Sequence, residues 1–368
     1  MDFTLSEDQQ QLVALADRIL SDKTTPARLA EVEAGVERFD RDLWAVLAST
    51  GLLGLAISDE FGGSGAGLLE LCVLLEQQGR RVASVPLWAT LVAGAWPVAQ
   101  HGSPEQRARW LPDVAAGTCV MTGAFESGCS WVTARLDGAG LRLEGHLLSV
   151  PAADLADCLL VPVRLADEGM VVVLVDLALD GVSVEPTTTT DRQSAGHVTL
   201  RDVRIARTDI LGGSGARVPV GRVSGPAVVG ICALGVGIAE EAVRLAATYT
   251  SERHQFGRAV ATFQGVALKA ADAYIDTEAM RVTMWQAAWR LNQGLPADAE
   301  VAVAKWWAAH GCHRVVHAAL HLHGGVGNDL DYPLHRYFLW GKQAEVVLGG
   351  ASQQRADLGR LIASGALG

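Results

Sequence analysis

Apolar residues recur at helical spacing over much of the first third of the chain. Ser6 followed three residues later by Gln9 forms a capping-box pattern, and the apolar positions of a helix come directly after it. A further helix is predicted over 68–81. The run 103–106, Ser-Pro-Glu-Gln, joins a capping Ser, a Pro at the first helical position and a Gln at the third. These patterns predict a helical N-terminal domain over 1–115.

A different pattern begins near Cys119. Short runs rich in β-branched residues appear there, separated by clusters of Gly, Pro, Asp and Thr. They predict a β domain over 116–212, of roughly a hundred residues. The clearest predicted strands are 141–143, 158–163, 171–175 and 197–205. A Gly-Gly-Ser-Gly run at 212–215 predicts a linker after this domain.

Long helical patterns return after about Pro226, and no further strand is predicted in this part of the chain. The predicted helices are 226–252, 262–293, 296–322 and a last one that begins near Leu334. They form a predicted C-terminal helical domain over 213–368. Helices, then strands, then helices indicate an α+β class fold with three domains.

The composition is that of a folded chain with a large core. Hydrophobic residues make up 49% of the 368 residues and charged residues 19%, which excludes a mainly disordered chain. Lys and Arg number 30 and Asp and Glu 41, so the net charge is −11. This balance excludes nucleic acid as a partner, because recognition of nucleic acid needs a basic face. An anionic small molecule needs only a local basic or dipolar site, and it remains open.

The six cysteines lie far apart and show no zinc-binding spacing, so we expect reduced thiols. The N-terminus runs directly into a polar, acidic helix start, and no signal peptide is predicted. No uninterrupted stretch of about 18 apolar residues is present, and no membrane-spanning helix is predicted. Together these features predict a cytoplasmic protein.

The run 253–258, Arg-His-Gln-Phe-Gly-Arg, joins two long predicted helices and has two interpretations. In the first it is only a helix–turn–helix connection, in which Gly257 provides the turn geometry. In the second Arg253 meets an anionic group, while Gln264 offers amide hydrogen bonds at the start of the next helix. Spacing alone favours the first interpretation.

A second informative run is 321–327, His-Leu-His-Gly-Gly-Val-Gly, at the end of a long apolar helix. Three glycines in four positions are more than one helix end requires, and they indicate that the backbone approaches another group closely. His313, His317 and His321 also share one helical face and form a candidate metal set. Because no turn or acidic partner gathers them, packed or hydrogen-bonded histidines are favoured, and no metal is predicted.

Four motifs occur in a fixed order along the chain. They are Gly-Leu-Leu-Gly-Leu with Glu-Phe-Gly-Gly at 51–63, Gly-Ser-Pro-Glu-Gln with Trp-Leu-Pro at 102–112, Arg-His-Gln-Phe-Gly with a later Gln at 253–264, and His-Gly-Gly-Val-Gly at 323–327. Together they resemble the motifs of the acyl-CoA dehydrogenase family, over nearly the whole chain. The resemblance implies an N-terminal helical domain, a middle β-barrel-like domain and a C-terminal four-helix bundle.

The resemblance also implies a cofactor that is shared between subunits. In this family FAD lies between two subunits: the middle domain of one holds the flavin ring, and the C-terminal helices of a neighbour hold the adenosine and the pyrophosphate. A Glu removes the α-proton of an acyl-CoA thioester while the β-hydride goes to the flavin. The residues implied here are Arg253 at the pyrophosphate, Gln264 hydrogen-bonded nearby, Phe256 packed against the cofactor, and His321, Gly324 and Gly325 along the adenosine.

The sequence departs from the family pattern at the flavin ring and at the catalytic base. The family's Thr-Glu-Pro…Gly-Ser run is replaced by Thr-Gly-Ala-Phe-Glu-Ser-Gly-Cys-Ser at 122–130, and its Trp-Ile/Val-Thr/Ser element by Ser-Val-Pro at 149–151. The usual position of the catalytic Glu is occupied by Gly349 or Leu348. The position used by some other members is occupied by Ala227. No catalytic residue is therefore predicted at either place.

This pattern of loss is orderly, because the motifs that serve a neighbour's FAD are intact. It resembles the non-catalytic β subunit of actinobacterial heteromeric (α2β2) acyl-CoA dehydrogenases that act on steroid side-chain CoA thioesters. The runs that carry this closer resemblance are 38–41, 273–276, 286–290, 333–339 and 348–351. The resemblance implies a paralogous catalytic subunit as partner, FAD shared with it, α,β-desaturation of a bulky acyl-CoA substrate, and an electron-transfer flavoprotein as electron acceptor.

Two other functions stay open. The chain is an active homo-oligomeric flavoenzyme if the base has moved to Glu345, about one helical turn before Gly349, or to Glu126 in the altered β motif. A solvated helix residue is the favoured interpretation of Glu345. The second alternative is a flavin-free scaffold or binding protein on the same fold, and retention of Arg253 and of the glycines at 324–325 argues against it.

Overall fold

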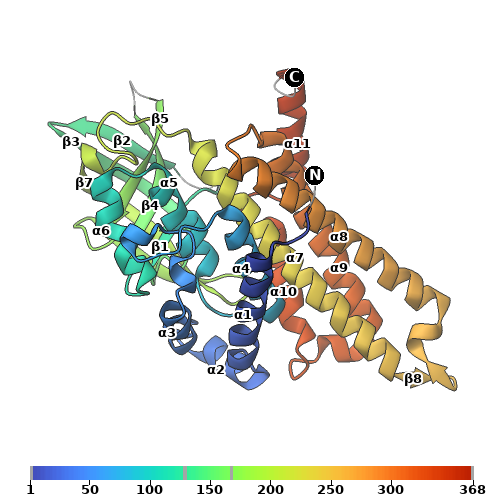
Figure 1. Cartoon of the computed structure of the whole chain (residues 1–368). Coiled ribbons are helices and arrows are strands. Elements are labelled where there is room, and N and C mark those ends of the chain that lie inside the picture. Colours follow the sequence, from blue (N-terminus) through green and yellow to red (C-terminus); the bar gives the residue numbers. More distant parts are fainter. Residues whose placement is uncertain (1–2, 127–130, 166–168, 366–368) are drawn as a thin grey trace. The chain divides into compact units, whose positions relative to one another are not determined.

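The computed structural model describes residues 3–126, 131–165 and 169–365 (Figure 1). The chain divides into two compact units. The helical unit comprises Met1–Ala27, Cys72–Ala83 and Val228–Gly368, and the sheet unit comprises Arg28–Leu71 and Ser84–Ala227. The three domains that the sequence predicts stay a prediction, because the boundaries of the two compact units fall at other positions in the chain.

Long helices make up the helical unit. Its elements are α1 (Glu7–Lys23), most of α4 (Leu68–Arg81) and of α7 (Val220–Glu252), α8 (Gln264–Asn292), α9 (Asp298–His323), α10 (Leu334–Val346) and α11 (Ala351–Ala363). The capping box predicted at the start of α1 is confirmed: Ser6 and Gln9 each accept, through the side chain, the backbone N–H of the other. The predicted C-terminal helices are confirmed to within a few residues, except that α7 begins six residues before Pro226, which lies inside it.

Glycines bring α4 and α7 into backbone contact. A Cβ added to Gly79 would lie 2.1 Å from the carbonyl oxygen of Leu234, and one added to Gly237 would lie 1.9 Å from that of Glu76. Any side chain at either glycine would therefore push the two helices apart. Arg281 of α8 donates to the buried carboxylate of Glu76 beside this contact. Three helices that are distant in sequence are thus joined in one core.

Lys305 of α9 is fully buried and stabilises the end of α10. Its Nζ donates to the carbonyl oxygens of Ala344, at 3.0 Å, and Glu345, at 3.2 Å. The last carbonyl groups of a helix have no hydrogen-bond donor within the helix and carry partial negative charge. The side chain of Lys305 supplies both the donor and a compensating positive charge.

One helix, α7, is long and apolar enough to cross a membrane by length and composition, whereas the sequence predicted none. The window that meets this criterion has a mean hydropathy of 1.7, and 83% of it is buried inside the protein. Such burial is typical of a core helix in a globular fold, and α7 has this place here.

A seven-stranded sheet forms the centre of the sheet unit (Figure 1). Its strands are β1 (Met121–Gly123), β2 (Trp131–Asp137), β3 (Gly140–Pro151), β4 (Cys158–Leu165), β5 (Gly169–Asp176), β6 (Val182–Thr188) and β7 (Ser194–Ala206). The order is β1-β4-β2-β3-β7-β6, with β5 paired to β4. The β1–β4 and β2–β4 pairs are parallel and the others antiparallel. Alternate Val and Leu residues of β3, β4, β5 and β7 build one buried core.

The four predicted strands are confirmed within β3, β4, β5 and β7, while β1, β2 and β6 were missed. Two of the missed strands lack the expected pattern, because β1 has only three residues and β6 contains Pro186. In β2 apolar and polar residues do alternate from Val132 to Asp137, so its pattern was present in the sequence and was overlooked. Proline is confined to edge strands, and β6 is the last strand in the sheet order.

Helices complete the sheet unit. They are α2 (Pro26–Ala34), α3 (Arg41–Ser49), the π-helical segment η3 (Trp88–Ala95), α5 (Trp96–His101) and α6 (Pro104–Ala115). The capping box predicted at Ser103 and Gln106 is confirmed at the start of α6. Gly94 allows η3 to pack on β1, because a Cβ added there would lie 2.5 Å from the Cβ of Met121.

The prediction that no strand follows Pro226 is wrong. A two-stranded hairpin of β8 (His254–Gln255) and β9 (Arg258–Ala259) joins α7 to α8. Strands of two residues are too short to show a period-two pattern, so the sequence indicated only a turn there.

Candidate cofactor-binding end and base positions

The connection between α7 and α8 is a tight hairpin that exposes its central aromatic residue. Phe256 and Gly257 occupy the turn with φ values of 53° and 77°. Two consecutive positive φ values define a type I′ turn, which glycine adopts freely and phenylalanine only under strain. The Phe256 side chain is 92% exposed. A strained residue that holds a large apolar side chain in water points to a ligand or partner at this place.

The predicted residues of this connection lie together. Arg253 follows α7, and its backbone N–H still bonds to the carbonyl oxygen of Tyr249, at 2.9 Å. Its side chain is exposed and forms no ion pair with the residues that the structure describes. Gln264, also exposed, is the first residue of α8. Between them the ring of Phe263 supports the turn, with the guanidinium carbon of Arg258 4.1 Å from its centroid.

The glycine run after α9 keeps its backbone open. Gly324 has φ 63° and ψ −139°, a conformation that is accessible essentially to glycine alone. A Cβ added to Gly324 or to Gly325 would meet nothing within 4 Å. The first glycine is therefore required by conformation and not by internal packing, and the backbone beside it faces outward.

The histidine that holds this run is His323, which the sequence analysis missed. The side chain of the predicted His321 is exposed, whereas that of His323 is 2% exposed. His323 Nδ1 lies 2.8 Å from the carbonyl oxygen of Ala319, which can only accept, so Nδ1 carries the proton. Its Nε2 then accepts from the hydroxyl of Tyr332, at 3.0 Å. Burial lowers the pKa of His323, which keeps the ring neutral at pH 7.

His323 also brings the two predicted motifs to one end of the helical unit. Its ring stacks on Tyr249, with the centroids 4.7 Å apart, and Tyr249 lies one helical turn before Arg253. We call residues 249–264 and 321–332 together the hairpin end. The signal that could have found His323 is its place directly before Gly324, where a buried ring fixes the last turn of α9.

The candidate metal set does not assemble. The ring centroids of His313 and His317 are 4.5 Å apart, and His313 Nδ1 lies 3.2 Å from Glu345 Oε2. Lys342 Nζ lies 3.0 Å from the same Nδ1. Its ammonium group therefore lies where a metal ion would have to bind this nitrogen. In the described part of the chain no group of three or more His, Cys, Asp or Glu side chains is arranged to hold a metal ion.

Glu345, the candidate relocated base, is held as a paired carboxylate. Its Oε2 accepts from Lys342 Nζ at 2.5 Å and contacts His313 Nδ1. Partial burial works to raise the pKa of Glu345, but the hydrogen bonds and charges of Lys342 and His313 outweigh it and lower the pKa. A base with a depressed pKa removes a proton less effectively, so this environment is unsuited to the role.

The usual base position is closed by a neighbouring amide. Leu348 and Gly349 both have positive φ, 55° and 95°. A Cβ added to Gly349 would lie 2.8 Å from Nε2 of Gln354, which donates to the carbonyl oxygen of Leu348 at 3.2 Å. Gln354 is buried, but its amide is the end of a flexible side chain, so the φ of 95° is the firmer obstacle to a side chain at Gly349.

The alternative base position is inside the core. Ala227 is fully buried, and its carbonyl oxygen accepts from Nε1 of Trp88, at 2.8 Å. Trp88 is itself 8% exposed. The indole of Trp88 therefore fills the space beside Ala227 and donates the hydrogen bond that the carbonyl oxygen of Ala227 accepts.

The segments that replace the family's ring-holding motifs are bonded to each other. We call 122–125 and 149–151 the ring position. Thr122 Oγ1 donates to the carbonyl oxygen of Pro151 at 2.6 Å, and Pro151 has no N–H to offer a ligand. A Cβ added to Gly123 would lie 2.4 Å from the ring of Phe125, which therefore covers that glycine. Glu126, the weaker alternative base, is half-buried, and 127–130 lie outside the described residues.

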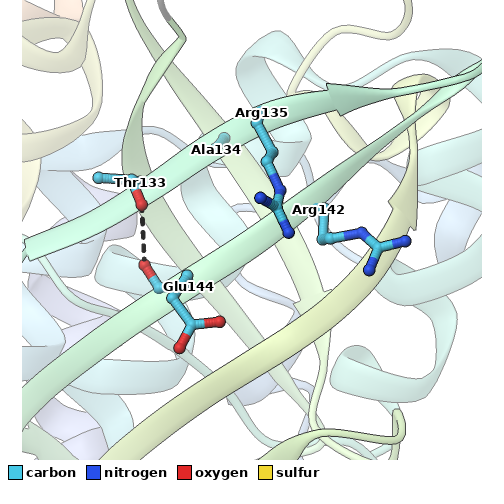
Figure 2. Close-up of a pocket in the computed structure, with 5 residues that line it drawn as sticks. All are labelled: Thr133, Ala134, Arg135, Arg142 and Glu144. Atoms are coloured by element: carbon cyan, nitrogen blue, oxygen red, sulfur yellow. Dashed lines mark hydrogen bonds between the residues drawn. The ribbon is translucent and has the colours of Figure 1, made fainter.

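An open pocket of about 380 Å³ lies on the sheet, and none of the predicted site residues lines it. Figure 2 shows the residues that line it: Thr133, Ala134, Arg135, Arg142 and Glu144. Arg142 is paired with Asp137 at 2.8 Å and with Asp202 at 2.5 Å. Arg135, the other cation that lines the pocket, lies 3.8 Å from Asp202. Both guanidinium groups therefore already have carboxylate partners within the sheet.

Comparison with known proteins identifies the family. Two family models match: "Acyl-CoA dehydrogenase, N-terminal domain" over residues 6–118 and "Acyl-CoA dehydrogenase, C-terminal domain" over residues 213–362. The chain belongs to the acyl-CoA dehydrogenase family. It is 38% identical over 373 residues to acyl-CoA dehydrogenase FadE27 of Mycobacterium tuberculosis, and the match covers 99% of both chains.

Two solved structures are similar to this chain over its full length. One is described as the Tcur3481–Tcur3483 steroid ACAD G363A variant: identity is 46%, the TM-score is 0.92, and the match covers 99% of this chain and 100% of that one. The other is the ChsE4–ChsE5 complex from M. tuberculosis, with 38% identity, a TM-score of 0.93 and 99% coverage of both chains. The predicted family and fold class are thereby confirmed.

FAD is the cofactor of acyl-CoA dehydrogenases, and the two candidate regions differ in how they suit it. The hairpin end offers an exposed guanidinium group, an exposed aromatic ring and open glycine backbone, which fit the phosphates and the adenosine of the cofactor. The ring position does not fit a flavin, because Phe125 covers Gly123 and the carbonyl oxygen of Pro151 is already bonded.

Proposed function

We propose that this acyl-CoA dehydrogenase family chain is a non-catalytic subunit of a heteromeric, FAD-dependent acyl-CoA dehydrogenase, and that it completes the FAD site of a paralogous catalytic subunit. One contrast carries the proposal. At the hairpin end Arg253 and Phe256 are exposed, and Arg253 forms no ion pair with the described residues, whereas the chain's own side chains occupy the space at Ala227, at Gly349 and at the ring position. A chain built in this way can hold part of a cofactor whose flavin ring belongs to another subunit.

The roles follow from the chemistry of each group. Arg253 pairs with the pyrophosphate, because a guanidinium group makes charge-assisted hydrogen bonds to phosphate oxygens. Gln264 donates an amide hydrogen bond nearby, and Phe256 packs against the cofactor. The backbone of His321, Gly324 and Gly325 lines the adenosine, and His323 keeps that backbone in place.

The reaction of the complex is α,β-desaturation of an acyl-CoA. Bound FAD supplies the hydride acceptor, while the catalytic Glu and most of the acyl-CoA contacts belong to the partner. The substrate that we propose is a bulky, steroid side-chain acyl-CoA, supported by the 46% identity to a chain of a steroid ACAD structure. An electron-transfer flavoprotein as electron acceptor and a cytoplasmic location complete the proposal.

The first experiment measures flavin absorbance of this chain purified alone and after co-expression with the paralogous subunit. We expect no flavin in the first case and about one FAD per heterodimer in the second. One FAD per chain in the protein purified alone would overturn the proposal and return attention to Glu345.

The second experiment replaces Arg253 with Ala in the co-expressed complex. A lost charged hydrogen bond of about 1.5–3 kcal/mol predicts FAD affinity weaker by about 10- to 100-fold. Arg355→Ala, which removes an exposed Arg of α11, is the matched control and keeps full FAD loading. Equal FAD loading in both variants would remove Arg253 from the site.

A further inference from the structure

We infer that Tyr249, His323 and Tyr332 are positioning residues for the FAD of the complex, because they fix the two cofactor-contacting segments of the hairpin end relative to each other. We call these three residues the aromatic cluster. The inference rests on the proposed function, since it names the side chains that set how tightly this chain holds its partner's cofactor.

The two cofactor-contacting segments come from different helices. Arg253 follows α7, and Gly324 follows α9. Pyrophosphate and adenosine are parts of one molecule, so a single FAD contacts both segments only when their separation matches it. Exposed connections between helices lose their order easily unless side chains hold them. A site built from two such connections needs a tie between them, because ordering them at the moment of binding would weaken the affinity.

Three aromatic rings provide a tie of this kind. The ring of His323 stacks on that of Tyr249, with the centroids 4.7 Å apart and the planes inclined by 22°. The centroid of the Tyr332 ring lies 5.1 Å from that of His323 and 6.4 Å from that of Tyr249. All three distances are in the range of aromatic pairs. The rings come from the last turn of α7, from the end of α9 and from the connection that follows η6 (Gly324–Asn328).

Hydrogen bonds fix the rings in this arrangement. Nδ1 of His323 donates to the carbonyl oxygen of Ala319, and its Nε2 accepts from the hydroxyl of Tyr332. The carbonyl oxygen of Tyr332 accepts in turn from Nδ1 of His335, at 2.8 Å, in the first turn of α10. Tyr332 is thus held at its side chain and at its backbone. The glycine run between His323 and Tyr332 is consequently fixed at both of its ends.

The protonation states suit these hydrogen bonds. Burial lowers the pKa of His323 and raises the pKa of Tyr332, so both groups are neutral at pH 7. A neutral imidazole whose Nδ1 carries the proton keeps Nε2 as an acceptor. The hydroxyl of Tyr332 is then the donor, and the pair forms a hydrogen bond without placing a charge beside the glycine run.

The aromatic cluster supports backbone that is open to a ligand. Gly324 and Gly325 are exposed, and Gly324 has the φ of 63° and the ψ of −139° that favour glycine. Gly327 is buried, and a Cβ added to it would lie 3.2 Å from the Cβ of His323. The run is therefore packed against His323 at one glycine and open at two others. Strained backbone that is held firmly from within is characteristic of a preorganised binding segment.

The first test removes one hydroxyl group from the aromatic cluster and one from a matched place. Tyr332→Phe deletes the donor to His323 and keeps the ring. Tyr337→Phe deletes a hydroxyl that donates to the carbonyl oxygen of Arg80, at 2.7 Å, in the same helical unit. Free FAD, measured by ultrafiltration over a dilution series of the co-expressed complex, gives the dissociation constant for FAD. We expect Tyr332→Phe to raise this constant about 3- to 10-fold and Tyr337→Phe to leave it unchanged.

Thermal unfolding of the same two variants separates positioning from stability. Each substitution removes one hydrogen bond from a partly buried hydroxyl, so we expect similar falls in melting temperature. Equal FAD dissociation constants for the two variants would overturn the inference, because the aromatic cluster would then contribute to the fold alone.

The second test removes a ring and restores it. Tyr249→Leu takes away the ring that stacks on His323, whereas Tyr249→Phe keeps the ring and loses only the hydroxyl. We expect the Leu variant to raise the FAD dissociation constant about 3- to 10-fold and the Phe variant to match the wild type. The same weakening in both variants would contradict stacking as the positioning contact.

His323→Asn replaces Tyr249→Leu if the latter does not fold. Asparagine keeps an N–H for the carbonyl oxygen of Ala319 and loses the acceptor for Tyr332. Tyr332→Phe should therefore add no further loss of FAD affinity on the His323→Asn background. An additive loss would mean that Tyr332 acts without His323, and the inference would fail.

A comparison with Arg253→Ala separates this inference from the proposed function. If Arg253→Ala loses FAD while Tyr332→Phe binds FAD as tightly as the wild type, the cofactor site stands and the positioning role fails. If both variants bind FAD as tightly as the wild type, the cofactor is held elsewhere, and the proposed function fails together with the inference.

Discussion

The hairpin end and the ring position are both related to flavin binding in this family, and they differ in where their polar groups find partners. At the hairpin end Arg253 and Phe256 are exposed, while the supporting His323 is buried and makes its hydrogen bonds within the chain. At the ring position Thr122 bonds to Pro151. The comparison teaches that a region with an altered motif is described by the side chains that fill it as well as by the residues that it lacks.

The largest expected effect is on the free energy of unfolding. It separates the buried Trp88, which packs beside Ala227, from the exposed Phe256. Trp88→Ala removes a buried indole and leaves the carbonyl oxygen of Ala227 without its donor. We expect it to lower the free energy of unfolding by about 3–5 kcal/mol, whereas Phe256→Ala changes it by less than about 0.5 kcal/mol. Urea denaturation of the chain alone measures both. Similar losses in the two variants would show that the regions do not differ in packing.

A smaller effect is expected when a carboxylate is restored at the usual base position. Gly349→Glu forces a side chain onto a φ of 95° and against Gln354. The expected loss of unfolding free energy is about 2–4 kcal/mol, from conformational strain and overpacking. Dehydrogenase activity of the chain alone should stay absent. Gly359→Glu, in an open position of α11, is the control, and activity in the Gly349 variant would contradict the closed-site view.

The sheet unit also contains a buried acid whose titration is linked to folding. Asp191 accepts from the hydroxyl of Thr189 and from the N–H of Gln193, at 3.2 Å, but burial outweighs these bonds and raises its pKa from 3.8 to about 6. The folded state therefore binds this proton more tightly than the unfolded chain. Its contribution to stability is complete below about pH 4 and is lost as the pH rises to about 6.

Asp191→Asn removes this dependence. The variant should gain about 1–3 kcal/mol of unfolding free energy relative to the wild type between pH 4 and pH 6. Urea denaturation across this range measures the difference, and Phe256→Ala at the hairpin end should run parallel to the wild type. A difference of opposite sign would mean that the hydrogen bonds, and not burial, dominate at Asp191.

The smallest effect concerns the alternative base. Glu345→Gln breaks partly exposed contacts with Lys342 and His313, which are worth about 0–1 kcal/mol. We expect unchanged turnover in the FAD-loaded complex, measured with an artificial electron acceptor. A large loss of turnover at unchanged FAD content would place a base at Glu345 after all.

Local patterns could be predicted from the sequence, and contacts between distant residues could not. The capping boxes at Ser6 and Ser103 depend on residues three positions apart, and both are present. The hydrogen bond from Trp88 to Ala227 joins residues 139 positions apart, and no spacing rule indicates it. The same limit applies to His321 and His323: the motif places both beside the glycines, but it does not show that His323 is the buried one.

The candidate site shows the same difference between what a local motif predicts and what only contacts between distant residues reveal. The resemblance indicated which family positions had lost their carboxylate or ring-binding residues. Only the structure shows that Phe125, Trp88 and Gln354 have taken up the space beside them. Phe125 lies in the altered motif at 122–130, but Trp88 and Gln354 belong to no motif, so a sequence comparison of motifs passes over these two.

The burial of Ala227 under Trp88 bears on how such a protein changes over generations. A single codon change that restored Glu at this position would place a charge in a packed core, and the chain would lose stability before it gained any chemistry. On the proposed function, a return to independent activity needs coordinated changes at the base, at the indole and at the ring position, so no single substitution frees this chain from its partner.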